Sequence, residues 1–330
     1  MLKQLVKKLG FPLFDIFFSP IILVAAVVLK FARILVLNQS AMAVNHAYVS
    51  KFIFSKIGVF PVIDHYPEPL FQKKNLKRPL NVERQLPGIQ WDIDGQAALL
   101  KSFSYEKELE KYPLEKPREL GYYYKCRSFN PGDAEILYSM IRFFKPKRMI
   151  EIGSGMSTLL SLDAIKMNKE ESGGDCELTC IEPFHMPWLE KKGVRVIRNL
   201  VENVRLDAFK ELNAHDILFI DSSHIIRPQG DLLFIFLELL PVLNPGVVVH
   251  IHDIFSPADI HEGFLVTEAL LYNEQYLLEA FLTCNPRFKV IAALSYLKRH
   301  FPQLMFEKCP GMRVHFEIQE PRSFWIKRIE

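Results

Sequence analysis

The stretch that decides the fold is Met149–Leu162, "MIEIGSGMSTLLSL". A short apolar run, typical of a buried strand, leads through Glu151 into a loop that holds Gly153 and Gly155. A segment with helical spacing follows. Glycines at such a turn let a ligand approach the backbone closely, next to a helix N-terminus. Three kinds of ligand use this arrangement: a phosphate, a dinucleotide, or the nucleoside of S-adenosylmethionine (SAM).

The same alternation of strand and helix continues through residues 127–330 and predicts a parallel α/β sheet. Ligands of such sheets bind beyond the carboxyl ends of the strands. Four acidic residues lie at or just after predicted strand ends: Glu151, Glu182, Asp221 and Asp253. A long helix is predicted over 268–284, "EALLYNEQYLLEAFLTC". The sequence therefore predicts a row of carboxylates at the binding edge of the sheet.

The glycine loop fits two of the three ligands poorly. No lysine follows Gly155 where a phosphate-binding P-loop requires one. The dinucleotide fingerprint needs a third glycine, and Thr158 stands at that position. The acidic residue before the glycines and Glu182 at the end of the next strand favour the nucleoside of SAM, since a carboxylate there accepts hydrogen bonds from both ribose hydroxyls.

Several separated blocks carry a family resemblance: "EIGSGMSTL", "CIEPFHMPWLEKKGV", "DILFIDSSHIIRPQGD", "GVVVHIHDIFSP", "YNEQYLLEAF" and "SFWIKR". In this order they resemble the class I SAM-dependent methyltransferases of methyltransferase family 24. The resemblance implies a Rossmann-like, seven-stranded, mostly parallel sheet of order 3-2-1-4-5-7-6 with helices on both faces. It also implies a set of SAM-binding residues: Glu151, Gly153, Ser154, Gly155, Ser157, Glu182 and Asp221. Ser157 departs from the class pattern, where many members carry a third glycine.

Candidates for the chemistry follow the fourth and fifth predicted strands: Asp221, His224, His252 and Asp253. In one interpretation Asp221, His252 and Asp253 hold a divalent metal ion that binds the acceptor, as the resemblance to metal-dependent sugar O-methyltransferases implies. His252 stands where those enzymes carry an acidic residue, which disfavours Mg²⁺. In the other interpretation there is no metal, and His224 or His252 is the general base. Each histidine is otherwise a hydrogen-bonded structural residue.

Asn273 and Glu274 open a helix face near the loop after the fifth strand. They either contact a polar acceptor, such as a sugar, or form a solvated helix surface.

The N-terminal region is strongly apolar. Ile16–Leu29 carries no charge, and Lys30 and Arg33 follow it on one helical face. This pattern predicts a membrane-associated helix, spanning or lying in one leaflet, with a buried helix of a soluble fold as the alternative. The predicted parts are a hydrophobic helix in 1–40, an accessory segment in 41–126 and a SAM-dependent methyltransferase domain in 127–330.

Composition excludes several classes of protein. The 330 residues carry a net charge of +3 without a basic tract, so nucleic acid is not an expected partner. Five scattered cysteines argue against a disulfide framework or a zinc site.

The expected function is SAM-dependent O-methylation of a small-molecule or glycan acceptor, such as a sugar or a surface-glycan precursor. The catalytic domain is expected to face the cytoplasm, where the cofactor is made, with the chain held at the membrane. The alternatives are a non-catalytic methyltransferase-like fold that binds a nucleoside or a protein partner, and an NAD-dependent oxidoreductase.

Overall fold

The computed structural model describes residues 2–37, 48–64, 66, 68–315 and 320–330. The chain divides into two compact units, residues 1–77 and residues 78–330. The expected boundary at residue 40 lies outside the described residues. The structure places no unit boundary at residue 126, because the segment from Arg78 onward packs with the α/β part of the chain.

The first unit contains α1 (Leu2–Leu37), α2 (Tyr48–Ile57) and the 3₁₀ turn η1 (Lys73–Asn75). The window Ile16–Arg33 has a mean hydropathy of 2.0 and is 6% buried within the structure. It is therefore long and apolar enough to cross a membrane, by length and composition. At its end, Arg33 forms an ion pair with Glu68, and its guanidinium lies 4.4 Å from the Phe60 ring centroid.

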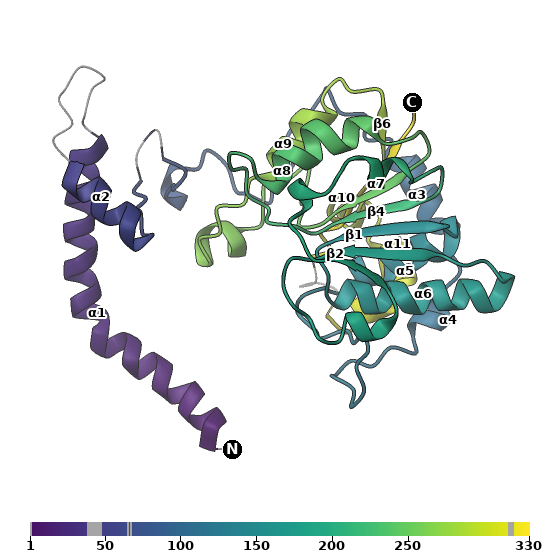
Figure 1. Ribbon diagram of the computed structural model, residues 1–330, viewed down its shortest axis with the longest axis horizontal. Helices are drawn as coiled ribbons and strands as arrows, with labels where there is room; N and C mark the ends of the chain where they lie inside the picture. Colours follow the sequence, from purple (N-terminus) through teal and green to yellow (C-terminus); the bar gives the residue numbers. More distant parts are fainter. Residues whose placement is uncertain (1, 38–47, 65, 67, 316–319) are drawn as a thin grey trace. The chain divides into compact units, whose positions relative to one another are not determined.

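The second unit is built on one seven-stranded sheet of order β3-β2-β1-β4-β5-β7-β6, which confirms the predicted order (Figure 1). All neighbouring strands pair in parallel except β7, which is antiparallel to both β5 and β6. The strands are β1 (Arg148–Ile152), β2 (Glu177–Ile181), β3 (Arg195–Ile197), β4 (Ile217–Ile220), β5 (Val248–Ile251), β6 (Phe288–Ala293) and β7 (Phe324–Arg328).

Helices cover both faces of the sheet, as Figure 1 shows for α5 and α6 on one side and α8 and α9 on the other. The first face holds α3 (Ile93–Lys101), α4 (Glu106–Leu109), α5 (Asp133–Phe144), α6 (Met156–Ser172), α10 (Leu294–His300) and α11 (Pro302–Lys308). The second face holds α7 (Asp207–Lys210), α8 (Asp231–Phe234), the π-helical turn η4 (Ile235–Leu239), η5 (Leu240–Val242) and α9 (Glu274–Leu282). Short turns complete the unit: η2 (Glu190–Lys192), η3 (Val201–Asn203), η6 (Gly263–Thr267) and η7 (Pro310–His315).

The two faces bury separate hydrophobic cores. Strand residues alternate between them, so Met149 and Phe219 pack on the α5 side, whereas Ile150 and Ile220 pack on the α9 side. The accessory segment contributes Leu100 and Phe103 to the first core, both at most 2% exposed. Segment 78–126 is thus part of the domain's own core.

The predicted helix over 268–284 is wrong in its first part. Helix α9 begins only at Glu274, and η6 is a separate turn before it. The chain is bent away at this point, because the N–H of Asn273 donates to the His224 carbonyl at 3.0 Å. The Asn273 side-chain oxygen also accepts a hydrogen bond from the Ile226 N–H at 2.7 Å. The loop after β4 therefore determines where α9 starts.

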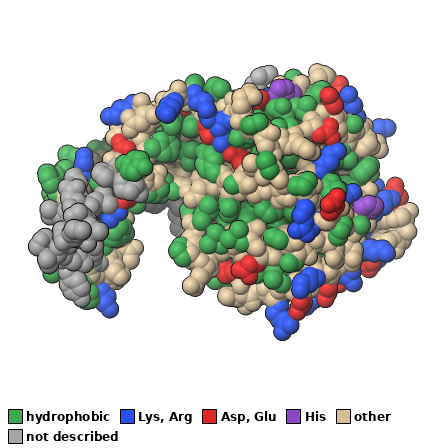
Figure 2. Space-filling view, turned by 90° about the horizontal axis from the view of Figure 1, so that it is seen from above, with side chains coloured by type: hydrophobic (Ala, Val, Ile, Leu, Met, Phe, Trp, Pro, Cys, Tyr) green, Lys and Arg blue, Asp and Glu red, His purple; other side chains and the backbone are tan. Residues whose placement is uncertain are grey.

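On the face shown in Figure 2, Lys and Arg side chains are interspersed with Asp and Glu around hydrophobic patches. No continuous basic surface is visible there among the described residues.

Candidate active site

The glycine loop follows β1 at the carboxyl edge of the sheet. Gly153 has φ +81°, and a Cβ at this position would lie 2.0 Å from the Asp221 carbonyl oxygen. Its N–H donates to the Ile181 carbonyl at 3.0 Å, which ties the loop to β2. Both the left-handed conformation and the close approach to the chain after β4 require glycine. Gly153 thus serves the fold of the loop itself.

Gly155 has a different role in the same loop. Its backbone is extended, with φ −178°, and a Cβ there would meet nothing within 4 Å. Its N–H donates to Thr158 Oγ1 at 3.0 Å at the start of α6. The fold alone therefore does not explain a glycine here, whereas a ligand lying over the loop would.

Glu182 lies where the sequence predicts the ribose-binding carboxylate, directly after β2. Its two carboxylate oxygens accept hydrogen bonds from the N–H groups of Ser154 at 3.0 Å and Phe184 at 2.8 Å. These contacts connect the glycine loop to the turn after β2 and orient the carboxylate. Each oxygen retains a lone pair for a further donor.

A cavity of about 280 Å³ opens beside Glu182 and continues to the chain after β4. Its lining includes Gly153, Glu182, Phe184, Leu200, Glu202 and Asp221. Phe184 and Leu200 are apolar and exposed at its rim, by 74% and 42%. Apolar walls with a few fixed carboxylates at one edge suit a nucleoside, whose base is flat and whose ribose donates hydrogen bonds. The lining therefore fits the nucleoside part of SAM.

Glu151 and Ser157 lie behind the loop and do not line this cavity. Glu151 is fully buried, accepts a hydrogen bond from Ser157 Oγ at 2.6 Å, and lies 3.6 Å from Cys180 Sγ. Burial raises the pKa of Glu151 to about 7, against the lowering effect of those hydrogen bonds. In this structure the pair supports the loop, and direct contact of Glu151 with the cofactor stays a prediction.

His224 is held between three carboxylates at the ends of β4, β5 and α9. Its Nδ1 contacts Glu274 Oε2 at 2.7 Å, and its Nε2 contacts Asp221 Oδ1 at 3.1 Å. Asp253 Oδ2 lies 3.6 Å from the same Nε2. Both His224 and Asp253 have left-handed backbone conformations, with φ +60° and +57°. Strained backbone conformations of this kind cluster at functional sites, where they direct a side chain into the site.

The charge of this cluster follows from its contacts. Burial alone would lower the pKa of His224, but hydrogen bonds to Asp221 and Glu274 and the charges of Glu274 and Asp253 raise that pKa well above its ordinary value. Burial would raise the pKa of Asp221, but that pKa is lowered, because the hydrogen bond from His224 and the charge of the same imidazolium stabilise the carboxylate. His224 is therefore an imidazolium at neutral pH and cannot accept a proton.

His252 is placed differently. It is 2% exposed at the end of β5, and neither ring nitrogen has a hydrogen-bond partner among the described residues. The Phe129 ring lies over it at 5.1 Å between centroids. His250, two residues earlier, stacks on Phe219 at 4.1 Å and contacts Ser323 Oγ at 2.8 Å, as expected of a structural residue. Of the two predicted candidates for general base, only His252 has a free nitrogen.

Three further residues complete the site, and sequence reasoning missed their roles. Glu274 is 2% exposed and contacts His224, so it is not part of a solvated helix surface. Asp133, the first residue of α5, accepts hydrogen bonds from the N–H groups of Arg322 and Ser323. Arg322 places Nε 3.0 Å from Asp253 Oδ1. Asp133 looks like an ordinary acidic residue at a helix start, and no motif surrounds Arg322. Their contacts with the site therefore become visible only in the folded structure.

Unpartnered buried polar atoms concentrate around this edge of the sheet. Within the described residues they include Asp133 Oδ2, Ser154 Oγ, Ser222 Oγ, both ring nitrogens of His252 and Glu274 Oε1. Buried polar groups without partners are costly, and a cluster of them marks a place where a ligand supplies the missing partners. The charged methionine end of SAM and a hydroxylated acceptor offer such partners.

The predicted metal set Asp221, His252 and Asp253 is not confirmed. Among the described residues no group of three His, Cys, Asp or Glu side chains is arranged to hold a metal ion. His224 Nε2 occupies the position between the carboxylates of Asp221 and Asp253, where the ion would sit. The carboxylates are already neutralised by His224 and Arg322, so the residues as placed do not fit the ion.

Comparison with known proteins agrees with the geometry. Residues 150–254 match the family model described as a methyltransferase domain. The strand order around these residues is the one that the sequence predicts for the class I methyltransferase fold. Residues 150–254 thus form a methyltransferase domain, as the resemblance in the sequence implies.

Similar proteins are distant. An uncharacterized protein of Archaeoglobus fulgidus is 27% identical over 186 residues, which cover 52% of this chain and 80% of that protein. An O-methyltransferase from Bacillus cereus, solved with SAH, shares 14% identity over 72% of this chain and 91% of its own, with a TM-score of 0.35. A structure of CmcI with Mg and SAM shares 17% identity over 84% and 95% of the two chains, with a TM-score of 0.33. Scores this low describe limited superposition.

Proposed function

We propose that this methyltransferase transfers the SAM methyl group to a hydroxyl of a polar acceptor, such as a sugar or a surface-glycan precursor, at the cytoplasmic side of a membrane. The observation that carries the proposal is the contrast between two neighbouring histidines. His224 is fixed as an imidazolium by Asp221 and Glu274, whereas neither ring nitrogen of His252 has a hydrogen-bond partner among the described residues, with Asp253 Oδ1 3.7 Å from its Nε2. Methyl transfer to a hydroxyl needs a positioned base that takes the hydroxyl proton, and His252 is the histidine that can accept one.

The residues have distinct roles in this scheme. Bound SAM would supply a methyl group activated by its positive sulfonium. The rest of the cofactor would be the leaving group, S-adenosylhomocysteine (SAH). A ring nitrogen of His252 accepts the acceptor's hydroxyl proton as the oxygen bonds to the methyl carbon and the carbon–sulfur electron pair stays on sulfur. Asp221 remains anionic next to the glycine loop and attracts the cationic cofactor. His224 keeps Asp221 and Asp253 in place.

A second cavity supports a hydroxylated acceptor. It has about 530 Å³ and is lined by polar and charged side chains with one aromatic, including Phe255, Asp259, His261, Glu262, Arg299 and Glu320. It lies next to the chain that leaves β5 after Asp253. The Arg299 guanidinium lies 3.3 Å from Glu320 and 3.9 Å from Glu83, and its Nη1 has no hydrogen-bond partner among the described residues. Carboxylates and a guanidinium around an aromatic ring suit a polyhydroxyl ligand.

A metal-assisted variant, in which Asp221, His252 and Asp253 would hold a divalent ion, does not fit these residues as they are placed. That variant requires His224 and Arg322 to move away from the two aspartates, because they occupy the ion's position. It therefore predicts activity that a chelator abolishes and an added divalent ion restores.

The membrane part of the proposal rests on Ile16–Arg33, which is apolar, long enough to span and largely unburied. SAM is made in the cytoplasm, so the catalytic unit is placed on that side. An acceptor carried on a lipid would then meet the site at the surface where the chain is held.

The test is transfer of a radiolabelled methyl group from SAM to lipid-linked sugars, free sugars and a small phenol, with and without chelator. We expect product with a sugar acceptor, no effect of the chelator, and loss of turnover in His252→Gln with unchanged SAM binding. Product with the phenol alone contradicts the glycan part. Turnover that survives His252→Gln contradicts the assignment of the base.

A further inference from the structure

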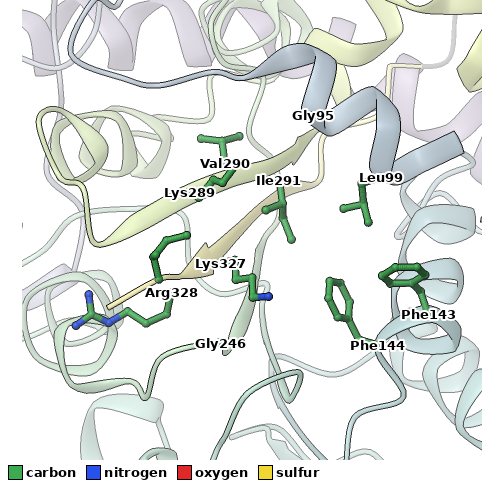
Figure 3. Close-up of a pocket in the computed structure, with 11 residues that line it drawn as sticks. Gly95, Leu99, Phe143, Phe144, Gly246, Lys289, Val290, Ile291, Lys327 and Arg328 are labelled. Atoms are coloured by element: carbon green, nitrogen blue, oxygen red, sulfur yellow. The ribbon is translucent and has the colours of Figure 1, made fainter. Parts of the chain in front are cut away.

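A third cavity, of about 540 Å³, lies at the opposite edge of the sheet from the cofactor loop. It is bounded by the end of α5, by α3, and by β6 and β7 (Figure 3). Leu99, Phe144 and Ile291 surround the space with apolar side chains, and Phe143 stands beside it, 41% exposed. Gly246, immediately before β5, marks the amino ends of the parallel strands. The cavity is thus separate from the methyl-transfer site.

The Lys327 side chain extends into this apolar space, and Figure 3 shows its ammonium directed toward Phe144. Nζ lies 5.8 Å from the centroid of the Phe144 ring. Lys327 is half-buried, and its ammonium has no carboxylate within ion-pairing distance in the described part of the chain. A partly desolvated ammonium without a counterion favours binding of an anion.

The other basic groups at this cavity are already engaged. Lys289 forms an ion pair with Asp92 at 2.7 Å. Arg328 is 2% exposed, and its guanidinium contacts the Leu243 and Arg287 carbonyls and the Phe288 ring instead of the cavity. Among the described residues that line this cavity, Lys327 is therefore the one cation left to pair with a negative charge.

We propose that this cavity binds a monoanionic amphiphile, a fatty carboxylate with a single acyl chain. The carboxylate would pair with Lys327, and the chain would lie against Leu99, Phe143, Phe144 and Ile291. The volume lies within the range of small-molecule sites, roughly 300–1,000 Å³. A single cation favours a ligand with one negative charge, and apolar walls make binding tighter as the acyl chain becomes longer. The proposal is independent of the methyl acceptor, since none of these residues reaches the cofactor loop.

The probe is octanoate, observed by saturation-transfer NMR on the full chain in deuterated detergent, with butanoate and octanol for comparison. Each added CH₂ is expected to tighten binding by about fourfold until the cavity is full. Lys327→Met, which keeps an unbranched side chain one atom shorter and removes the charge, should weaken octanoate binding by about tenfold or more. Lys166→Met, at an exposed lysine of α6, is the matched control and should change nothing.

A second readout locates the site, because octanoate also enters micelles. A diazirine-bearing octanoate is photo-crosslinked and mapped by mass spectrometry, in the wild type and in Leu99→Trp, which fills the cavity. Crosslinks to α3 and to the end of α5 that disappear in Leu99→Trp support the proposal. Crosslinks confined to Ile16–Arg33, or equal binding by Lys327→Met and wild type, overturn it. Unchanged SAM binding shows that the variants are folded.

Discussion

Glu274 Oε2 lies 2.7 Å from His224 Nδ1, although the two residues are 50 positions apart in the chain. The contact joins the first turn of α9 to the loop after β4. Asp221 contacts the other ring nitrogen, so both nitrogens of His224 face a carboxylate and the ring stays protonated. A histidine that follows a strand-end aspartate looks like a general base in sequence, but here it is a fixed positive charge.

Replacing Glu274 by Gln should lower the pKa of His224, because one of the carboxylates that stabilise the imidazolium is lost. The pKa should move toward the ordinary value of a histidine side chain. NMR of ¹⁵N-labelled histidine measures this, with His224→Gln to assign the signal and Glu268→Gln as an exposed control. If His224 of the wild type titrates near its ordinary pKa, the claim that the carboxylates keep it protonated is wrong.

Gly153 and Gly155 should respond oppositely to alanine. Gly153→Ala places a methyl against the Asp221 carbonyl in a left-handed conformation, so unfolding free energy should fall by about 2–4 kcal/mol. Gly155→Ala meets no atom, so stability should change by less than about 0.5 kcal/mol. SAM affinity should nevertheless fall about tenfold in Gly155→Ala, because the new methyl would occupy the cofactor's space.

Denaturant unfolding and calorimetric SAM titration of both variants separate the two effects. Full SAM affinity in a stable Gly155→Ala protein would mean that the cofactor does not lie over this glycine.

The buried Glu151 predicts a pH dependence of stability. Burial raises its folded-state pKa to about 7, above the ordinary value of 4.5, so the native state binds the extra proton between these values. Its contribution to stability is present below pH 4.5 and is lost as the pH rises through 7, by at most about 1.4 kcal/mol per pH unit. Glu151→Gln should remove this loss, so the variant gains stability relative to the wild type as the pH rises.

Urea unfolding at several pH values from 4.5 to 7.5 measures the difference, with Glu177→Gln at an exposed position as the control. Parallel curves for Glu151→Gln and wild type would show that the Glu151 carboxyl titrates normally.

The N-terminal helix should lose membrane association when a charge is placed at its centre. An aspartate there costs about 2.5–3.5 kcal/mol on insertion. Leu23→Asp should therefore shift protein from the carbonate-resistant membrane fraction to the supernatant. Val82→Asp, at an exposed position of the second unit, should not. Wild-type protein found wholly in the supernatant would refute the anchor.

Sequence predicted most of what local patterns encode. Apolar runs and the glycine loop placed the strands, and the family resemblance supplied their order, which the structure confirms. The strand-end residues Glu182, Asp221 and Asp253 do converge on one edge, because parallel strands share their carboxyl ends. What the pattern could not show is which side chains meet there.

Contacts between distant segments account for the difference. Arg322 reaches Asp253 only because β7 runs antiparallel beside β5, and Asp133 joins them from the start of α5. The helix predicted from 268 begins at Glu274 because Asn273 is held by the loop after β4. Such contacts depend on tertiary packing, which overrides local propensity.

The most direct measurement is calorimetric titration of the detergent-solubilised full chain with SAM, SAH and NADH, in wild type and Glu182→Ala. We expect SAM and SAH to bind and NADH not to bind. Glu182→Ala should weaken both by about tenfold or more, because it removes the carboxylate at the cavity and its hydrogen bonds to Ser154 and Phe184. Failure of SAM and SAH to bind, or binding of NADH instead, would contradict the assignment of an adenosyl sulfonium to the glycine loop.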